Sequence, residues 1–153
     1  MTATDHGPGV RVPPPVMVAG LLAVAWGLGR AVPVPLGPPL PEVGALVVFA
    51  ALALIGWALI VMMQAGNDPR PDKPDAALVE RGPFRFGRNP IYLGFILGML
   101  GFALRWGDLW GWIALVASHL VLDRLVVAKE EAYLAGRFGA AYDAYRARVR
   151  RWV

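Results

Sequence analysis

The chain has 153 residues, of which 57% are hydrophobic and 17% are charged, and it contains no cysteine. With a mean hydropathy of +0.51, this composition excludes an ordinary soluble domain and fits a small integral membrane protein. The lack of cysteine excludes disulfides, thiolate metal sites and cysteine nucleophiles. The net charge of +4 is better explained by basic flanks on membrane helices than by nucleic-acid binding, so we expect a membrane and no nucleic acid as partners.

Two apolar segments in the first half of the chain are predicted to span the membrane. Residues 1–15 are rich in proline and glycine and are interpreted as a flexible tail. Residues 16–32 are apolar except for Arg30 and are just long enough to cross a bilayer. Prolines within residues 33–41 exclude a helix and predict a tight connection. Residues 43–63 carry no charge and form the clearest predicted span.

A polar loop and a helical hairpin follow. Residues 64–89 form a loop whose length is typical of a functional or disordered connection. Residues 91–104 are apolar but short, and after a turn residues 109–127 run back across the membrane. From residue 129 the pattern becomes amphipathic, which predicts one or two helices lying against the membrane or the loop.

The basic residues predict the orientation of these spans. The tail, the long loop and the C-terminal region carry every Lys and Arg except Arg30 and Arg105. The positive-inside rule then places the termini and the long loop in the cytoplasm. We expect an all-α polytopic membrane protein with about four transmembrane helices and C-terminal cytoplasmic amphipathic helices. Residues 16–153 are predicted to form its single membrane-embedded domain.

Ionisable residues in the last predicted span mark a candidate site, because charge in a span is costly and usually faces the bundle interior or water. On an ideal helix His119, Asp123 and Glu130 lie within about 40° of one another, while Arg124 and Glu131 share a second stripe. They form either a functional polar seam or a set of pairing and snorkelling residues at the interface.

Residues 82–94 lead into the third apolar segment. Gly82-Pro83 predicts a turn, and Asn89-Pro90 predicts a helix start with Asn89 as an N-cap or a ligand contact. Tyr92 either contacts a ligand or belongs to the aromatic belt. Gly94 and Gly98, four residues apart, allow close helix packing or reflect the abundance of glycine in membrane helices. Two histidines far apart in the sequence, His6 and His119, predict no metal site.

Residues 82–94, Gly-Pro-Phe-Arg-Phe-Gly-Arg-Asn-Pro-Ile-Tyr-Leu-Gly, resemble the signature of the isoprenylcysteine carboxyl methyltransferase family. A second block resembles it too: Glu130-Glu131 followed by Leu134, Phe138-Gly139, Tyr142, Tyr145 and Val149. The order and spacing of both blocks agree with the family, as does the predicted hairpin between them. The resemblance covers residues 78–149, roughly half of the chain.

The resemblance implies an enzyme of the bacterial inner membrane that depends on S-adenosyl-L-methionine (SAM), with its cytoplasmic cofactor site in residues 66–149. The methyl group would pass to a lipophilic acceptor, such as the carboxylate of a prenylcysteine-like or other lipid-like substrate. By position, the candidate cofactor contacts are Leu78, Val79, Phe84, Asn89, Pro90, Tyr92 and Glu130. The candidate catalytic residues are Arg88, which matches the motif arginine, and Arg124, which is chosen for its charge in the last predicted span and not for a match to the family.

The chain departs from the family at two positions. Asn89 stands where the family usually has histidine, and Val126 stands where eukaryotic members carry a substrate-side arginine. Asparagine forms hydrogen bonds but cannot act as a base near neutral pH. A carboxylate acceptor needs no base, whereas an amine or a thiol would need Asp123 or Glu130 to accept its proton. The alternative function is a non-catalytic membrane protein that retains the fold as a binding or assembly module.

Overall fold

The computed structural model describes residues 8–10, 12–68 and 73–153, and these residues form helices without a named strand. The membrane-length part consists of α1 (Pro14–Ala31), α2 (Pro41–Gln64), α3 (Pro90–Trp106) and α4 (Leu109–Val121). The remaining elements are the 3-10 turn η1 (Gly82–Arg85), the π-helical segment η2 (Leu122–Val127), α5 (Ala128–Phe138) and α6 (Ala140–Arg148). The predicted all-α fold is confirmed.

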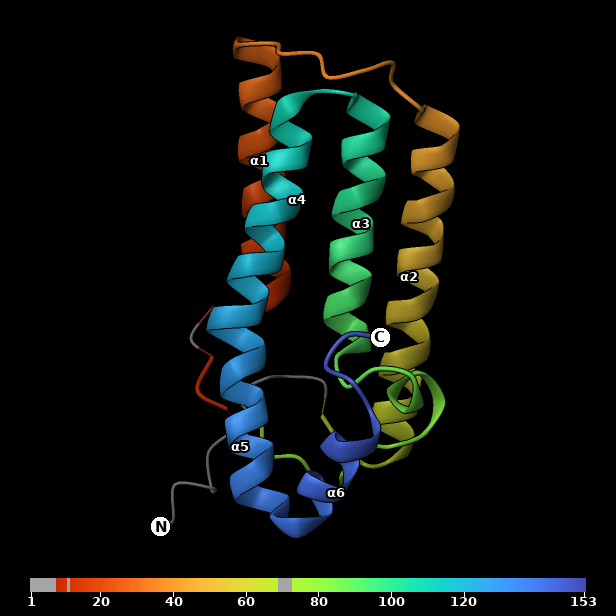
Figure 1. The fold of residues 1–153 in the computed structure, drawn as a ribbon, viewed down its shortest axis with the longest axis vertical. Coiled ribbons are helices and arrows are strands. Elements are labelled where there is room, and N and C mark those ends of the chain that lie inside the picture. The colour runs from red at the N-terminus through yellow and green to blue at the C-terminus, as the bar shows by residue number, and fades with distance from the viewer. Residues whose placement is uncertain (1–7, 11, 69–72) are drawn as a thin grey trace.

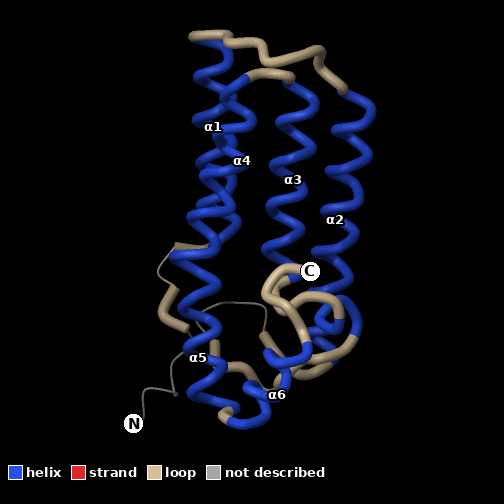
Figure 2. The backbone as a smooth tube through the Cα atoms, viewed as in Figure 1, coloured by secondary structure: helices blue, strands red, loops and turns tan. Residues whose placement is uncertain are grey.

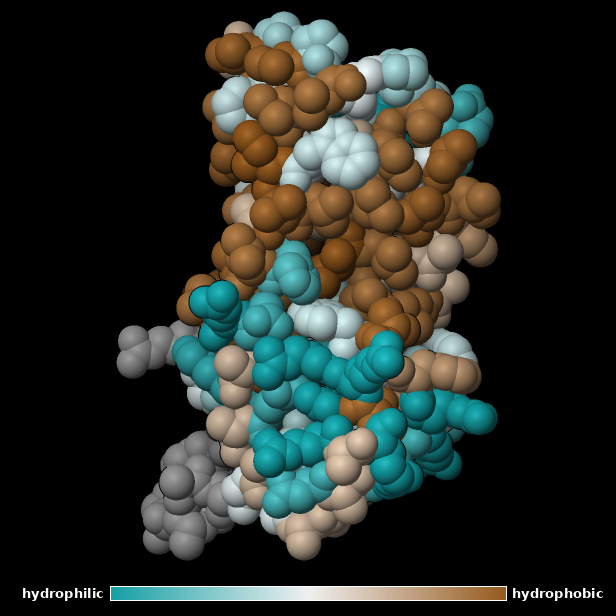
Figure 3. Space-filling model, in the orientation of Figure 1, coloured by the Kyte–Doolittle hydropathy of each residue, from teal (hydrophilic) through white to brown (hydrophobic). Residues whose placement is uncertain are grey.

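The four longer helices stand side by side as a bundle, with α5, α6 and the loop after α2 gathered at one end (Figure 1, Figure 2). Three helical stretches are long and apolar enough to cross a membrane: α1, α2 and the continuous helix Leu109–Phe138. With 17 residues, α3 is shorter and packs against both α2 and α4. Figure 3 shows hydrophobic side chains over the bundle and hydrophilic ones over the α5–α6 end. This is the architecture of an integral membrane protein.

Glycines allow α3 to pack closely against α2. A Cβ on Gly101 would lie 2.7 Å from the carbonyl oxygen of Gly44, and one on Gly44 would lie 2.4 Å from the carbonyl oxygen of Gly101. A Cβ on Gly94 would lie 2.4 Å from Cγ1 of Ile55. The packing role predicted for Gly94 is thus confirmed, but a Cβ on Gly98 would only reach an ordinary contact with Ala51 Cβ at 4.0 Å, so Gly98 does not share that role.

The first helix begins earlier than the sequence analysis predicted. Proline is well tolerated in the first turn of a helix, so Pro14 opens α1 instead of extending the tail. Val10 is buried and packs with core residues such as Val18. The predicted tail boundary at residue 15 is therefore too far along the chain. Residues 1–7 and 11 of that tail lie outside the described residues.

The fourth span does not stop near residue 127. The helix continues from α4 through η2 into α5 without a break and carries the chain out of the apolar layer. It ends at Gly139, whose φ of 51° turns the chain into α6. The two predicted amphipathic helices are present, but the first of them is the extension of a membrane helix. This extension brings Glu130 and Glu131 next to the loop that precedes α3.

Candidate active site

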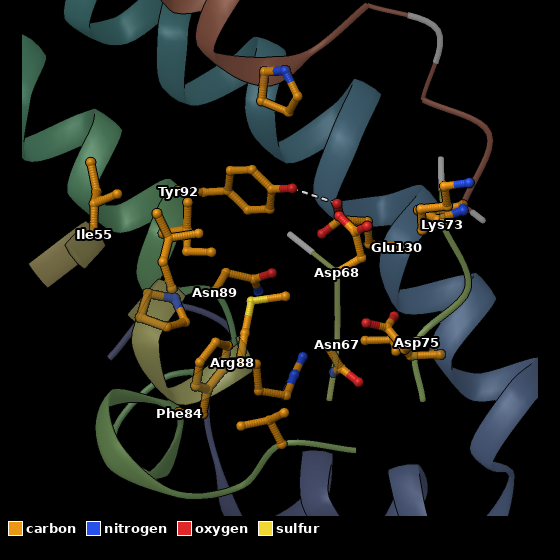
Figure 4. Close-up of a pocket in the computed structure, with 18 of the residues that line it drawn as sticks. Ile55, Asn67, Asp68, Lys73, Asp75, Phe84, Arg88, Asn89, Tyr92 and Glu130 are labelled. Carbon is orange, nitrogen blue, oxygen red and sulfur yellow. Dashed lines mark hydrogen bonds between the residues drawn. The ribbon is translucent and has the colours of Figure 1, made fainter. Parts of the chain in front are cut away.

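A cavity of about 510 Å³ opens at the polar end of the bundle, between α3, α5 and the loop after α2. Its volume is in the range of small-molecule and cofactor sites. One side is polar, as Figure 4 shows around Asp75, Arg88 and Glu130. The other is apolar and comes from the bundle. All seven predicted cofactor contacts line it, together with Arg88: Leu78, Val79, Phe84, Asn89, Pro90, Tyr92 and Glu130.

The loop that covers the cavity is held in place by Asn67, a residue that the sequence analysis did not identify. Its buried side-chain oxygen accepts hydrogen bonds from the backbone N–H groups of Ala76 and Ala77, both at 2.9 Å. Its amide nitrogen donates to the carbonyl oxygen of Ala77 at 2.9 Å. Asn67 therefore closes the loop into a compact turn and presents the following residues, Leu78 and Val79, to the cavity.

Replacing Asn67 with alanine is expected to open this turn, because three hydrogen bonds to the backbone are lost together. Each contributes about 0.5–1.5 kcal/mol. We expect faster hydrogen exchange and faster proteolysis within residues 73–81, with the bundle helices unchanged. Unchanged exchange in this loop would contradict the assigned role.

The end of the loop is fixed by α6. Gly82, with a φ of 60°, turns the chain into η1, and buried Phe84 packs beside Val61 and Val79. The Tyr145 hydroxyl donates to the carbonyl oxygen of Phe84 at 2.6 Å. Burial raises the pKa of Tyr145 well above its ordinary value, so this hydroxyl keeps its proton. A residue of the second motif thus positions a residue of the first.

Glu130 joins α5 to α3 across the cavity. The Tyr92 hydroxyl donates a hydrogen bond to a carboxylate oxygen of Glu130 (Figure 4). Nearby, the Tyr133 hydroxyl accepts a hydrogen bond from the backbone N–H of Asp75 at 3.0 Å, and Arg137 donates to the Asp75 carbonyl at 2.6 Å. Burial raises the pKa of the Asp75 carboxyl group, and the Arg137 charge partly opposes that shift. Together with Asp68, the residues Glu130 and Asp75 place three carboxyl groups in the lining of this cavity.

The C-terminal segment (residues 149–153) covers the start of α3. The Arg88 guanidinium donates to Glu131 Oε1 at 2.7 Å and to the carbonyl oxygen of Val149 at 2.6 Å. The Asn89 amide donates to the carbonyl oxygen of Arg151 at 3.0 Å. A Cβ on Gly87 would lie 1.8 Å from the Trp152 carbonyl oxygen, so only glycine fits there. Asn89 occupies the predicted N-cap position, but its side chain makes no cap hydrogen bond.

Arg151 completes this network and was also missed by the sequence analysis. Its guanidinium donates to Glu131 Oε2 at 2.6 Å and to Asp123 Oδ1 at 3.1 Å. Glu131 therefore sits between Arg88 and Arg151. Hydrogen bonds from Arg151 to these carboxylates raise the pKa of its guanidinium further. The run Arg150-Arg151-Trp152 after the last amphipathic helix was the available signal, but a basic terminal run ordinarily indicates solvated chain.

The polar seam predicted for an ideal helix is wrong, because η2 (Leu122–Val127) is π-helical. A π turn takes up one extra residue, which rotates everything after it by about 100° relative to an ideal α-helix. Glu131 and Asp123 therefore lie on the same side of the helix, and both accept hydrogen bonds from Arg151. Glu130 instead faces Tyr92. His119 packs instead against Trp152, with ring centroids 5.1 Å apart.

Arg124 is not at the cavity. Its side chain is 77% exposed and lies 3.8 Å from Asp123. Val126, at the position of the eukaryotic arginine, is fully buried in the bundle core. Of the two candidate catalytic arginines, the structure brings only Arg88 to the cavity.

The apolar helices and the part-polar, part-apolar cavity at one end of them define a membrane-embedded protein with a candidate ligand site at the edge of its apolar layer. The family model described as phospholipid methyltransferase matches residues 42–141, from α2 to the start of α6. The chain belongs to the phospholipid methyltransferase family. That membership and the helical architecture identify a membrane methyltransferase.

Two relatives are similar to parts of the chain. An uncharacterized protein of Haemophilus influenzae is 35% identical over 63 residues, which cover 41% of this chain and 100% of that protein. The protein-S-isoprenylcysteine O-methyltransferase of Schizosaccharomyces pombe is 33% identical over 78 residues, which cover 49% of this chain and 32% of that enzyme. The matched region thus amounts to about a third of the yeast enzyme. The family model and the match to the yeast enzyme confirm the family resemblance that the two motifs indicated.

Proposed function

We propose that this protein transfers a methyl group from SAM to a lipophilic acceptor in the cavity beside Tyr92 and Glu130. The observation that carries this proposal is the two-sided lining of the cavity. Charged and amide side chains face it from the loop and α5, while Ile55, Leu59 and Phe95 face it from the bundle. A soluble charged donor and a membrane-dissolved acceptor are the two ligands that such a lining suits.

The polar lining fits the parts of SAM. The Glu130 carboxylate accepts hydrogen bonds from hydroxyl or amino groups, and Tyr92 keeps it oriented. The amino end of α3 borders the cavity and favours a carboxylate through its dipole. Leu78, Val79 and Phe84 offer an apolar surface to a ring. When bound, SAM supplies a methyl group already activated on a sulfonium.

With that activation supplied, the protein has to position the acceptor and exclude water. A carboxylate acceptor needs no base, which is consistent with Asn89 donating its amide to the Arg151 carbonyl. We propose that Arg88 acts as a positioning residue, because its guanidinium holds Glu131 and the C-terminal segment. An amine acceptor would lose its proton to Glu130, since Asp123 is already paired with Arg151.

We place the cavity on the cytoplasmic side of a bacterial inner membrane, where SAM is available. The basic residues flank the bundle at the end that carries the cavity, which the positive-inside rule assigns to the cytoplasm. The alternative of a non-catalytic assembly protein is less well supported, because the family match covers the first motif and the start of the second, and all seven predicted cofactor contacts line one cavity.

Methyl transfer is tested on membranes that contain or lack the protein, incubated with methyl-labelled SAM. We expect label in the extracted lipid only when the protein is present. Label released by mild alkali identifies a carboxyl methyl ester, and alkali-stable label identifies another acceptor group. Equal labelling of both membranes, together with no saturable SAM binding by the purified protein in detergent, would overturn the proposal.

A further inference from the structure

A second, wholly membrane-level cavity adjoins the first. It has a volume of about 160 Å³ and lies between α1, α2 and α3, with Leu22, Leu52 and Phe102 among its walls. We call it the apolar groove. Ile55 and Phe95 line both cavities, so the groove adjoins the apolar side of the candidate active site. It is too small for a complete ligand and suits one part of a larger one.

The helices that flank the groove are not packed against each other. α1 packs mainly on α4 and α2 packs mainly on α3, so α3 forms the floor between them (Figure 1). The groove therefore faces the hydrocarbon layer at the depth of the bundle. A chain of a lipid can pass from the bilayer to the cavity along this route without entering water.

Gly98 gives the groove its depth. A Cβ at this position would have Ala51 Cβ, at 4.0 Å, as its nearest neighbour, so the glycine is not required for helix packing. Gly94 and Gly101, on the same helix, would both clash with α2 if they carried a Cβ. Because Gly98 has no side chain, the surface of α3 is recessed at the groove. Glycine lowers the intrinsic stability of the helix at this position.

We propose that the apolar groove binds the single hydrocarbon chain of the acceptor, and that Gly98 determines which chains fit. This inference rests on the proposed methyl transfer and adds to it the acceptor's binding mode. A chain lying over Gly98 from Phe102 toward Phe95 brings its head group into the active-site cavity beside Tyr92. The occupant is an extended isoprenoid or acyl chain, because the lining offers hydrophobic contact and almost no polar partner.

The binding test uses a farnesylcysteine that carries a photoreactive diazirine on its isoprenoid chain, with the purified protein in detergent. We expect mapped cross-links on groove residues such as Leu22, Leu52 and Phe102. Gly98→Leu, which fills the groove, is expected to reduce them at least about tenfold. Gly56→Leu is the matched control, because Gly56 has open space around it and lines neither cavity. Cross-links that are equal in Gly98→Leu and Gly56→Leu would overturn the proposal.

The activity test compares farnesylcysteine with dimethylallylcysteine as methyl acceptors. We expect the Gly98→Ala, Val, Leu series to lose activity progressively on the long chain, by about tenfold or more at leucine, and to keep activity on the short one. SAM binding should be unchanged throughout the series. Equal loss on both acceptors would contradict chain selection. If wild type methylates neither acceptor and no lipid is labelled in membranes, the proposed function fails, while cross-linking still reports on the groove.

Discussion

Replacing Glu130 with glutamine is expected to weaken SAM binding by about 10- to 100-fold, which is the cost of losing a charged hydrogen-bond acceptor. The side chain is half-buried, accepts the Tyr92 hydroxyl and faces the cavity from the helix extension. Glutamine keeps the size of the side chain but loses the charge and half of the accepting capacity. Calorimetric titration of the purified protein with SAM measures the change.

The matched control for this experiment is Glu42→Gln, because Glu42 is an exposed glutamate at the first turn of α2, away from the cavity. It should bind SAM like the wild type. Tyr92→Phe should fall between the two, since it removes only the group that orients Glu130. If Glu130→Gln binds as tightly as wild type while remaining folded, Glu130 is not a cofactor contact.

Glu131→Gln is expected to lower the free energy of unfolding by about 3 kcal/mol, because it removes one partner from a largely buried ion pair. The side chains of Arg88 and Glu131 are only 13% and 16% exposed. Without the carboxylate, Arg88 loses the one ion pair that it makes among the described residues, and Arg151 loses its shorter ion pair. Thermal unfolding in detergent reports the stability, and hydrogen exchange in residues 149–153 reports release of the C-terminal segment.

Arg151→Gln distinguishes the role of the Arg88–Glu131 ion pair from that of the C-terminal segment. Its side chain is 38% exposed, so solvent screens the interaction and the expected loss is about 1 kcal/mol. Both variants should release the C-terminal segment, but only Glu131→Gln should also destabilise the start of α3, through Arg88. Equal losses in the two variants would contradict the central position of Glu131.

The two motifs and their family resemblance were enough to predict a set of residues that line one cavity. Residues 82–94 contain the turn, the helix start and Tyr92, while Glu130 follows at the end of the next long apolar run. Each is a local pattern with a local physical cause, such as proline at the first helical position. Their meeting in one cavity follows from the short hairpin between them, which sequence spacing already indicated.

Asn67 and Arg151 were not predictable in the same way. The side chain of Asn67 bonds to backbone groups about ten residues ahead, and Arg151 bonds to carboxylates 20 and 28 residues before it. Contacts between residues this far apart in the sequence follow no helical or strand periodicity, so no sequence pattern predicts them. Arg124 failed for the opposite reason, because an ideal helical period was applied across a segment that is not α-helical.

By itself, the sequence determined the helical membrane class, the short hairpin and the family motifs, because hydropathy and turn residues act over a few neighbouring positions. The resemblance already singled out Glu130, but only the tertiary structure shows why Glu130 and not Glu131 faces the cavity. The π-helical turn in η2 adds a residue to the helix, which turns Glu130 to Tyr92 and Glu131 to the two arginines. That choice depends on hydrogen bonds to α3 and to the C-terminal segment, and such contacts between distant parts of the chain leave no local pattern.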